Sequence, residues 1–309
     1  MNADLRAAVA DYLTFRRALG FKLDRADWLL ESFVDHLDVR HVSQITTEIA
    51  LEWATRPEQA SSWWWRQRLG IVRGFARYMQ NIDPASEVPP PGLISAVLPR
   101  ATPFMFSDDD IAALMTAAAR LTPTLRAGTY NRLIGMLAVT GMRVSEAVNL
   151  DDDDVKIDEG LIVVRHTKFD KTRELVLQTT TLDALNSYRR SRQHHQPSPS
   201  TPAFFVSGAG TRLLYPNVLG VFHRLVDETG LTERRVGRRP RMHDLRHRFA
   251  VQSVLDWYRN GLDVGPRMAA LSTYLGHVKP ADTYWYLSAT PELLGLAAER
   301  LEMSVEVPS

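Results

Sequence analysis

The stretch VKIDEGLIVVRHTKFDKTRELVL, residues 155–177, decides the fold, because its hydrophobic period differs from that of the chain on either side. It contains three short runs rich in β-branched and other large apolar residues, VKI, LIVVRH and RELVL, which the polar stretches DEG and KFDK separate. Runs of this kind, joined by tight polar connections, are typical of strands in hairpins. We therefore expect a small antiparallel sheet in the middle of the chain.

Helical patterns surround this sheet. Upstream, SDDDIAALMTAAARL begins at Ser107, a good N-cap, and its three aspartates suit the positive end of a helix dipole. We expect further helices near residues 130–139, in RVSEAVNL after a break at Gly141, and again after about residue 214. The polar stretch RQHHQPSPS (192–200) predicts a loop instead.

The last helical pattern is TPELLGLAAERLE (290–302). Thr290 can cap this helix, and Pro291 fits its first position. Its apolar stripe predicts a docking face, and the surface that it meets is either its own domain or a neighbouring protomer.

A proline-rich stretch, NIDPASEVPPPGLISAVLPRATP, interrupts helical and strand patterns alike. Ahead of it, apolar residues recur at three- and four-residue steps, which indicates several helices. We expect a helical domain over residues 1–81, a linker over 82–103 and a larger domain over 104–309. The fold class is therefore mainly α with a small antiparallel β-sheet.

The composition excludes several kinds of protein. Of the 309 residues, 45% are hydrophobic and 24% are charged, which is ordinary for a soluble chain. No apolar run could span a bilayer and the N-terminus lacks the order of a secretory signal, so we expect a cytoplasmic protein. There is no cysteine, and the nine histidines lack the usual zinc spacings. We therefore expect no disulfide, no thiolate chemistry and no metal site.

The net charge of only +1 hides an uneven distribution. Seven arginines fall within residues 234–248, whereas acids gather at 108–110 and 151–154. This distribution indicates one basic face rather than a uniformly basic protein. The candidates for DNA contact in this cluster are Arg238, Arg239 and Arg241.

A second arginine face is predicted in SSWWWRQRLGIVRGFARYMQ (61–80). At about 100° per residue, Arg66, Arg73 and Arg77 fall on one side of a helix and apolar residues on the other. Such a stripe would suit phosphates along a DNA groove, and an ordinary solvated face would give the same pattern.

Three segments carry residues that fit one reaction. They are TGMRVSEAVNL (140–150), HDLRHRFA (243–250) and YLGHVKPADTYWYL (274–287). Taken singly, each has an ordinary interpretation as a surface arginine, a solvated helix or a helix end. Together they provide cations and hydrogen-bond donors for a phosphodiester, whose non-bridging oxygens gain charge during transesterification.

The roles in such a reaction follow from the side chains. Arg143 and Arg246 could each hold two phosphate oxygens, because a guanidinium is a planar fork that stays charged. His243 shares a helix face with Arg246, and His277 could donate a further contact. A tyrosine would attack the phosphorus, and the leaving 5′ oxygen would take a proton from a general acid.

These motifs resemble, in order, the signature of the tyrosine recombinase (phage integrase) family: TG-x-R-x-SE, then H-x-x-R, then LGH, then a tyrosine. In the family the tyrosine usually lies nine residues beyond the LGH histidine, which here is Tyr286. Tyr284 is the competitor, and on a helix it would point roughly 200° away from Tyr286. The resemblance implies a two-domain, C-shaped DNA clamp built from a helical core-binding domain and a catalytic domain.

The resemblance also assigns the remaining roles. Lys168 matches the first lysine of the family's common GKGxKxR turn and would protonate the leaving oxygen, and Lys171 matches the second. The turn here carries Thr167 and Phe169 where glycine is usual. Glu146 and His247 would orient the arginines and the helix, with plain local salt bridges as the alternative. The implied catalytic set is Arg143, Lys168, His243, Arg246, His277 and Tyr286.

The function implied is strand exchange through a covalent 3′-phosphotyrosyl intermediate. The resemblance implies a homotetramer on double-stranded DNA, two protomers per site, with room for other recombinases or accessory proteins and with no cofactor. The ending LSATPELL is similar to recombinases of bacterial transposable elements, so integrase and transposase are both expected. Two alternatives remain: a type IB topoisomerase, which uses the same residues, and a DNA-binding protein of this fold without catalysis.

Overall fold

The computed structural model describes residues 3–96, 102–165, 172–234 and 238–276, together with Leu293 and Gly295. The chain divides into two compact units, residues 1–100 and 101–309. Each unit has a hydrophobic core of its own. Within the described ranges, no helix is both long enough and apolar enough to cross a membrane.

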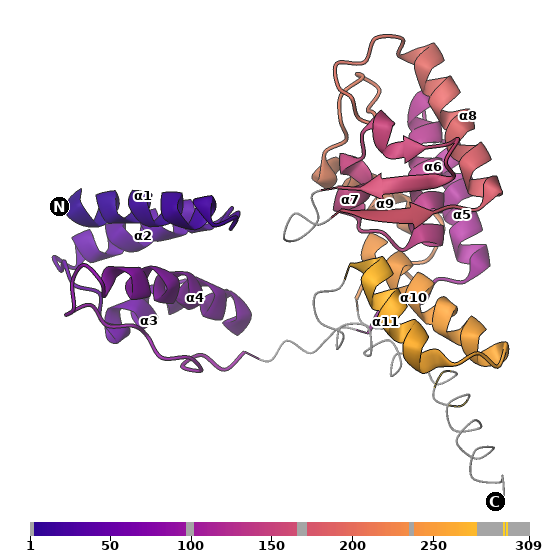
Figure 1. The fold of residues 1–309 in the computed structure, drawn as a ribbon. Helices are drawn as coiled ribbons and strands as arrows, with labels where there is room; N and C mark the ends of the chain where they lie inside the picture. Colours follow the sequence, from indigo (N-terminus) through magenta and orange to yellow (C-terminus); the bar gives the residue numbers. More distant parts are fainter. Residues whose placement is uncertain are drawn as a thin grey trace, which may run out of the picture. The chain divides into compact units, whose positions relative to one another are not determined.

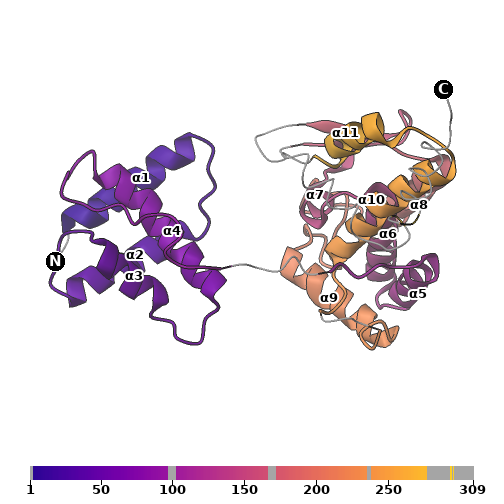
Figure 2. The ribbon, with the colours of Figure 1, turned by 90° about the horizontal axis from the view of Figure 1, so that it is seen from below.

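The first unit is a helical bundle (Figures 1 and 2). Its helices are α1 (Ala3–Ala18), α2 (Ala26–Val39), α3 (Thr47–Thr55) and α4 (Ser62–Met79). Thr46 and Ser61 cap α3 and α4, because each side chain accepts a backbone N–H from the first turn of the helix that follows. Phe33, Trp53 and Phe75 are fully buried in the core that the four helices share.

Part of the proline-rich stretch also packs on the first unit. Val88 and Ile94 lie against the helical core. The backbone N–H of Glu87 donates to the carbonyl of Ile45, and its carboxylate accepts the N–H of Thr47. The segment up to residue 96 therefore belongs to the folded first unit rather than to a free linker.

The helices of the second unit gather around α6 (Figure 1). Helices α5, α8 and α10 all contact α6, which is buried on most of its sides, as expected for a central helix that is apolar all round. The capping box predicted at Ser107 is present, since Ser107 and Asp110 exchange hydrogen bonds. The helices are α5 (Asp108–Ala119), α6 (Thr124–Thr140), α7 (Val144–Asn149), α8 (Thr179–His195), α9 (Tyr215–Glu228), α10 (Met242–Arg259) and α11 (Val264–Leu275).

Helix α8 corrects one expectation. It continues to His195, through residues predicted to form a loop. Arg192 explains the difference, because its buried guanidinium donates to the carbonyls of Ala203 and Phe204 and to the carboxylate of Asp152. Tertiary contacts of this kind leave no trace in a local hydrophobic pattern.

The predicted antiparallel sheet is confirmed in the second unit (Figure 1). Its strands lie in the order β1 (Val155–Lys156), β2 (Leu161–Val164) and β3 (Arg173–Val176). Ile162 pairs with Leu175 and Val164 pairs with Arg173, so these four side chains point to the same face. The first three are buried against the helices, and Arg173 is the charged residue on this inner face.

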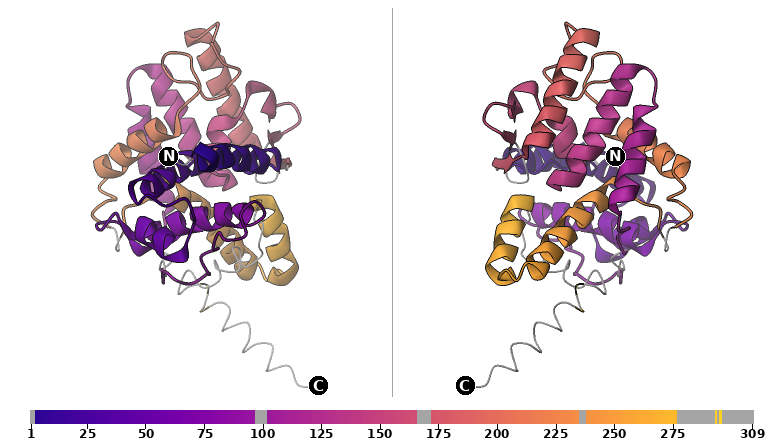
Figure 3. Two further views of the ribbon diagram at one scale, coloured as in Figure 1. Left: turned by 90° about the vertical axis from the view of Figure 1, so that its left-hand side faces the viewer. Right: turned by 90° about the vertical axis from the view of Figure 1, so that its right-hand side faces the viewer.

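A smaller core joins α10 to α11, which lie side by side in Figure 3. Val254, Leu271 and Leu275 belong to it, and so does Leu293. Leu293 comes from the apolar stripe of the last predicted helix, and this residue is buried against its own unit. The rest of that pattern, apart from Gly295, lies outside the described residues.

Candidate functional site

Arg246 joins the three motif segments. It lies on α10, is only 2% exposed and donates Nη1 to the carbonyl of Gly141 (2.9 Å) and Nη2 to the carbonyl of Leu275 (2.6 Å). Both carbonyls stand at the C-terminal ends of helices, where backbone oxygens lack a partner within the helix and the helix dipole is negative. A buried cation is well placed there, and it holds α10 against the ends of α6 and α11.

Glycines end both of these helices. Gly141 has φ +60° and Gly276 has φ +68°, in the left-handed region that favours glycine. A Cβ atom on Gly141 would lie 2.5 Å from Cδ1 of Phe249, and one on Gly276 would lie 3.1 Å from Nη1 of Arg173. Glycine is therefore required by the backbone conformation and by the close approach of neighbouring side chains.

Arg143 stands at the N-cap of α7, beside this junction. Its Nη1 donates to Oε1 of Glu146 (2.7 Å), and its Nη2 donates to the carbonyl of Gly276 (3.0 Å). The backbone N–H of Arg143 also donates to Oε2 of Glu146 (2.8 Å). The side chain of Arg143 remains 32% exposed, so its guanidinium is anchored and still open to an anion.

Arg173 is a member of the cluster that our reading of the sequence missed. From β3 it donates Nη1 to Oε1 (3.1 Å) and Nη2 to Oε2 (2.8 Å) of Glu146. Burial alone would raise the pKa of Glu146, but the hydrogen bonds and charges of Arg173 and then Arg143 outweigh it and hold that pKa below its ordinary value. The signal was present, because Arg173 closes the GKGxKxR pattern of which only the lysines were considered.

His243 and His247 lie one turn apart on α10, with ring centroids 4.7 Å apart and planes at 90°. Desolvation, followed by the charge of Arg246, lowers the pKa of His243 to about 4. Part of the His243 side chain is nevertheless exposed. It is therefore a neutral imidazole at neutral pH, able to donate or accept a hydrogen bond at the surface of the site.

The structure thus brings together Arg143, Glu146, His243, Arg246 and His247 from the predicted set. The remaining predicted positions lie outside the described residues: Lys168, Lys171, His277, Tyr284 and Tyr286. Gly276, which precedes His277 in the chain, is itself part of the arginine cluster.

Two arginines of the predicted N-terminal stripe hold the chain itself. Arg66 donates to the carbonyl of Ala96 (3.0 Å), and Arg73 donates to the carbonyls of Pro89 (2.7 Å) and Pro90 (2.9 Å). Arg77 is exposed on the same helix. That these three arginines contact DNA stays a prediction.

The arginines of residues 234–248 are more neutralised than the sequence suggested. Arg234 and Arg248 form ion pairs with Asp110 and Asp108, two of the acids that the sequence analysis treated as gathered elsewhere. The expectation that these acids lie apart from the cluster is therefore wrong. Of the DNA-contact candidates, Arg238 is exposed, Arg239 contacts Asp227 and the His223 carbonyl, and Arg241 contacts Asp244 (2.7 Å).

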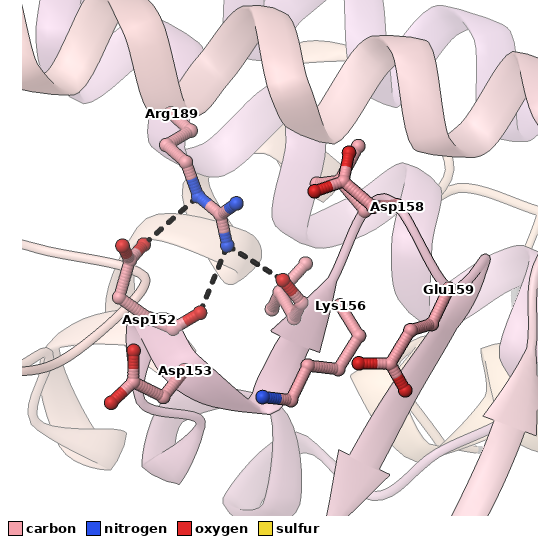
Figure 4. A pocket seen from close by; sticks show the side chains of 8 residues that line it. Asp152, Asp153, Lys156, Asp158, Glu159 and Arg189 are labelled. Carbon is pink, nitrogen blue, oxygen red and sulfur yellow. Dashed lines mark hydrogen bonds and ion pairs between the residues drawn. The ribbon is translucent and has the colours of Figure 1, made fainter.

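A pocket beside β1 is lined by acids and shares no residue with the arginine cluster (Figure 4). Arg189 closes one side of it by donating to Oδ1 (3.1 Å) and the carbonyl (2.9 Å) of Asp152 and to the carbonyl of Val155 (2.7 Å). In the described part of the chain, no group of three or more histidines and acids could hold a metal ion. The chemistry of the site therefore has to be sought at the arginines.

Comparison with known proteins was made for sequence and for fold. The model of the phage integrase family matches residues 105–292. The Sinorhizobium fredii protein y4rB, whose name describes an integrase/recombinase, is 40% identical over 303 residues, which is 96% of each chain.

Two solved structures share the fold. The XerH site-specific recombinase bound to palindromic difH DNA, a post-cleavage complex, has a TM-score of 0.67 at 18% identity and covers 89% of this chain and 78% of its own. The Tn1549 transposon integrase in complex with a circular intermediate DNA also has a TM-score of 0.67, at 17% identity, over 95% and 99% of the two chains.

Proposed function

This chain belongs to the phage integrase family of tyrosine recombinases, and from that premise we propose that it cuts and rejoins DNA at specific sites through a covalent 3′-phosphotyrosyl intermediate. The observation that carries the proposal is the arginine cluster. Arg143 and Arg246 are fixed by carbonyls at the ends of α6 and α11, and Arg143 stays open to an anion. Such a pair of fixed cations suits a phosphodiester whose charge increases in the transition state.

The proposed reaction exchanges one phosphoester for another. The phenol oxygen of Tyr286 forms a bond to the phosphorus, and the bond from phosphorus to the 5′ oxygen breaks. Lys168 gives its proton to that leaving oxygen, and the neutral imidazole of His243 is the group of the described site that could take the phenol proton. His277 would add a donor to the phosphate. Because the bond energy is kept in the phosphotyrosine, the reverse reaction can reseal the DNA without a cofactor.

The partners are proposed on the same footing. XerH was solved on difH DNA and the Tn1549 integrase on a transposon DNA, which supports duplex DNA as the ligand of this chain. We infer a homotetramer with two protomers at each site, with other recombinases or accessory proteins as additional partners, acting on DNA at the nucleoid. The transposon integrase and the ending LSATPELL favour a mobile element as the source of the substrate. Arg77, Arg238 and the other predicted arginines remain the candidates for backbone contact.

The experiment that tests the proposal captures the covalent adduct. The protein is expressed in its host, the cells are denatured rapidly, and DNA joined to protein is isolated and sequenced. Tyr286→Phe and Tyr284→Phe are run beside the wild type as a matched pair. We expect a 3′-phosphotyrosyl adduct at a defined sequence with the wild type and Tyr284→Phe, and none with Tyr286→Phe.

The other outcomes are equally informative. An adduct that persists in Tyr286→Phe and disappears in Tyr284→Phe would transfer the nucleophile to Tyr284. Relaxation of plasmids that lack any specific site, without exchange, would identify a topoisomerase. Absence of any adduct from the wild type, together with retained DNA binding, would contradict the covalent mechanism and identify a DNA-binding protein.

A further inference from the structure

Glu146 is shared between two arginines, and the two hold it differently. Arg173 grips both carboxylate oxygens in a fork, Nη1 on Oε1 (3.1 Å) and Nη2 on Oε2 (2.8 Å). The side chain of Arg143 reaches only Oε1, through Nη1 (2.7 Å), and turns Nη2 to the carbonyl of Gly276 (3.0 Å). The fork on the carboxylate is therefore occupied by Arg173 and not by Arg143.

The position of Arg173 in the sheet explains why it takes this role. It pairs with Val164, which is 1% exposed, so its side chain leaves the strand on the inner face of the sheet. A charge on that face needs a partner, because burial without one is costly. Glu146, whose side chain is 8% exposed, is that partner, and the Arg173 side chain is itself only 13% exposed. Arg173 therefore lies behind Arg143 and not at the open side of the cluster.

Sharing the carboxylate leaves Arg143 with donors for a substrate. An arginine side chain has five N–H donors, and the contacts of Arg143 with described residues use two of them. The charges agree with this arrangement: Arg143, Arg173 and Arg246 contribute three positive charges and Glu146 one negative charge, a net of two positive. Without Arg173 the net would be one positive, and Glu146 could take both Nη atoms of Arg143 and draw it away from Gly276.

We propose that Arg173 is a positioning residue for the phosphate site: by occupying the fork of Glu146, it keeps the guanidinium of Arg143 on Gly276 and available to the scissile phosphate. This inference rests on the proposed function, because it concerns the same reaction. Arg173 acts through Glu146 and Arg143 and need not touch the DNA.

The test is single-turnover cleavage of the DNA identified by adduct capture, with DNA affinity measured in parallel. The variants are Arg173→Ala, Arg173→Lys, Arg143→Ala and the double variant of Arg143→Ala with Arg173→Ala. Arg189→Ala is the matched control, since Arg189 binds Asp152 and the Val155 carbonyl next to the same sheet but outside the arginine cluster. Circular dichroism checks that each variant is folded.

We expect Arg173→Ala to slow cleavage about 10²-fold, the size of effect that a misplacement of about 1 Å can have, with a much smaller loss of DNA affinity. Arg173→Lys should recover part of the rate, because an ammonium keeps the charge but cannot form the fork. In the Arg143→Ala background, removal of Arg173 should have no further effect, because the two residues act in series. Arg189→Ala should cleave at the wild-type rate.

Several results would overturn the inference while leaving the proposed function intact. One is a wild-type cleavage rate for a folded Arg173→Ala, and another is a full additional loss in the double variant. If Arg173→Ala does not fold, Arg173→Lys decides, since a wild-type rate with lysine would mean that the fork is unnecessary. Absence of an adduct from the wild type would instead overturn the proposed function, and the role of Arg173 in cleavage with it.

Discussion

A neutral histidine stands beside a buried arginine in the site. Desolvation, and then the charge of Arg246, holds the pKa of His243 at about 4, well below the ordinary value for histidine. A bound phosphodiester would place a negative charge among these arginines, and an opposite charge favours the protonated imidazole. DNA binding should therefore raise the pKa of His243 and make it a better proton acceptor at the moment when the tyrosine must lose its proton.

The pH dependence of His243 is directly measurable. We expect its imidazole resonance in the free protein to titrate with a midpoint near 4, and the midpoint to rise in the DNA complex of the cleavage-deficient Tyr286→Phe variant. Because the folded-state pKa lies below the unfolded value, the contribution of this group to stability is complete above about pH 6.5 and is lost as the pH falls toward 4. His243→Gln should reduce the loss of stability in that window, as measured by urea unfolding. A midpoint near 6.5 in the free protein would contradict this account.

Some of these residues could be identified from the sequence and one could not. Arg143, Glu146 and Arg246 lie in motifs whose residue types and spacing indicate phosphate chemistry. The role of Arg173 depends on the register that sets it opposite Val164, and on a carboxylate 27 positions away in the chain. Neither the pairing register nor the meeting of two distant segments can be deduced from local periodicity.

At the scale of elements, the site is built from helix ends. Helices α6 and α11 both stop at a left-handed glycine, and both leave carbonyls that arginines then bind. The helix dipoles of α6 and α11 thus reinforce the same group of cations. The site is as rigid as the packing of α10 against those two helix ends, which links the position of Arg246 to the stability of the second unit.

Substitution of Gly141 tests this dependence. Gly141→Ala should destabilise the second unit by more than Gly230→Ala, because both glycines have positive φ but only Gly141 would push a Cβ into Phe249. The backbone effect is about 1–2 kcal/mol in each case, and overpacking should add about 1–3 kcal/mol for Gly141→Ala. Urea unfolding followed by far-UV circular dichroism gives both values. Equal losses would mean that α10 can move away from the end of α6 at little cost.

The elements themselves differed in how far the sequence could predict them. The start of α5 at Ser107 and the small sheet follow from strong local signals, a capping box and short β-branched runs. The end of α8 does not, because its last turn depends on the buried contacts of Arg192 with Ala203, Phe204 and Asp152. Local patterns predict where an element can form, whereas tertiary contacts decide how far it extends.

At the scale of the whole molecule, the chain has separate cores, and the first unit extends further along the sequence than its helices do. Proline excludes regular structure in residues 82–96 but does not prevent packing. Val88 and Ile94 lie against the helical core, and Arg73 holds the carbonyls of Pro89 and Pro90. An extended segment with open carbonyls is the natural acceptor for an arginine stripe that would otherwise be solvated.

This arrangement predicts that a fragment of residues 1–96 is more stable than one of residues 1–81, although both contain all four helices. Partial burial of Val88 and Ile94 should contribute about 2–4 kcal/mol, measured by urea unfolding of the two fragments. Arg73→Ala should cost the longer fragment about 1–2 kcal/mol through its lost hydrogen bonds and leave the shorter one unchanged. Arg77→Ala, at an exposed position of the same helix, should change either by less than about 0.5 kcal/mol. Equal stability of the fragments would mean that the segment after α4 is a free linker, and Arg73 would then be available for DNA like Arg77.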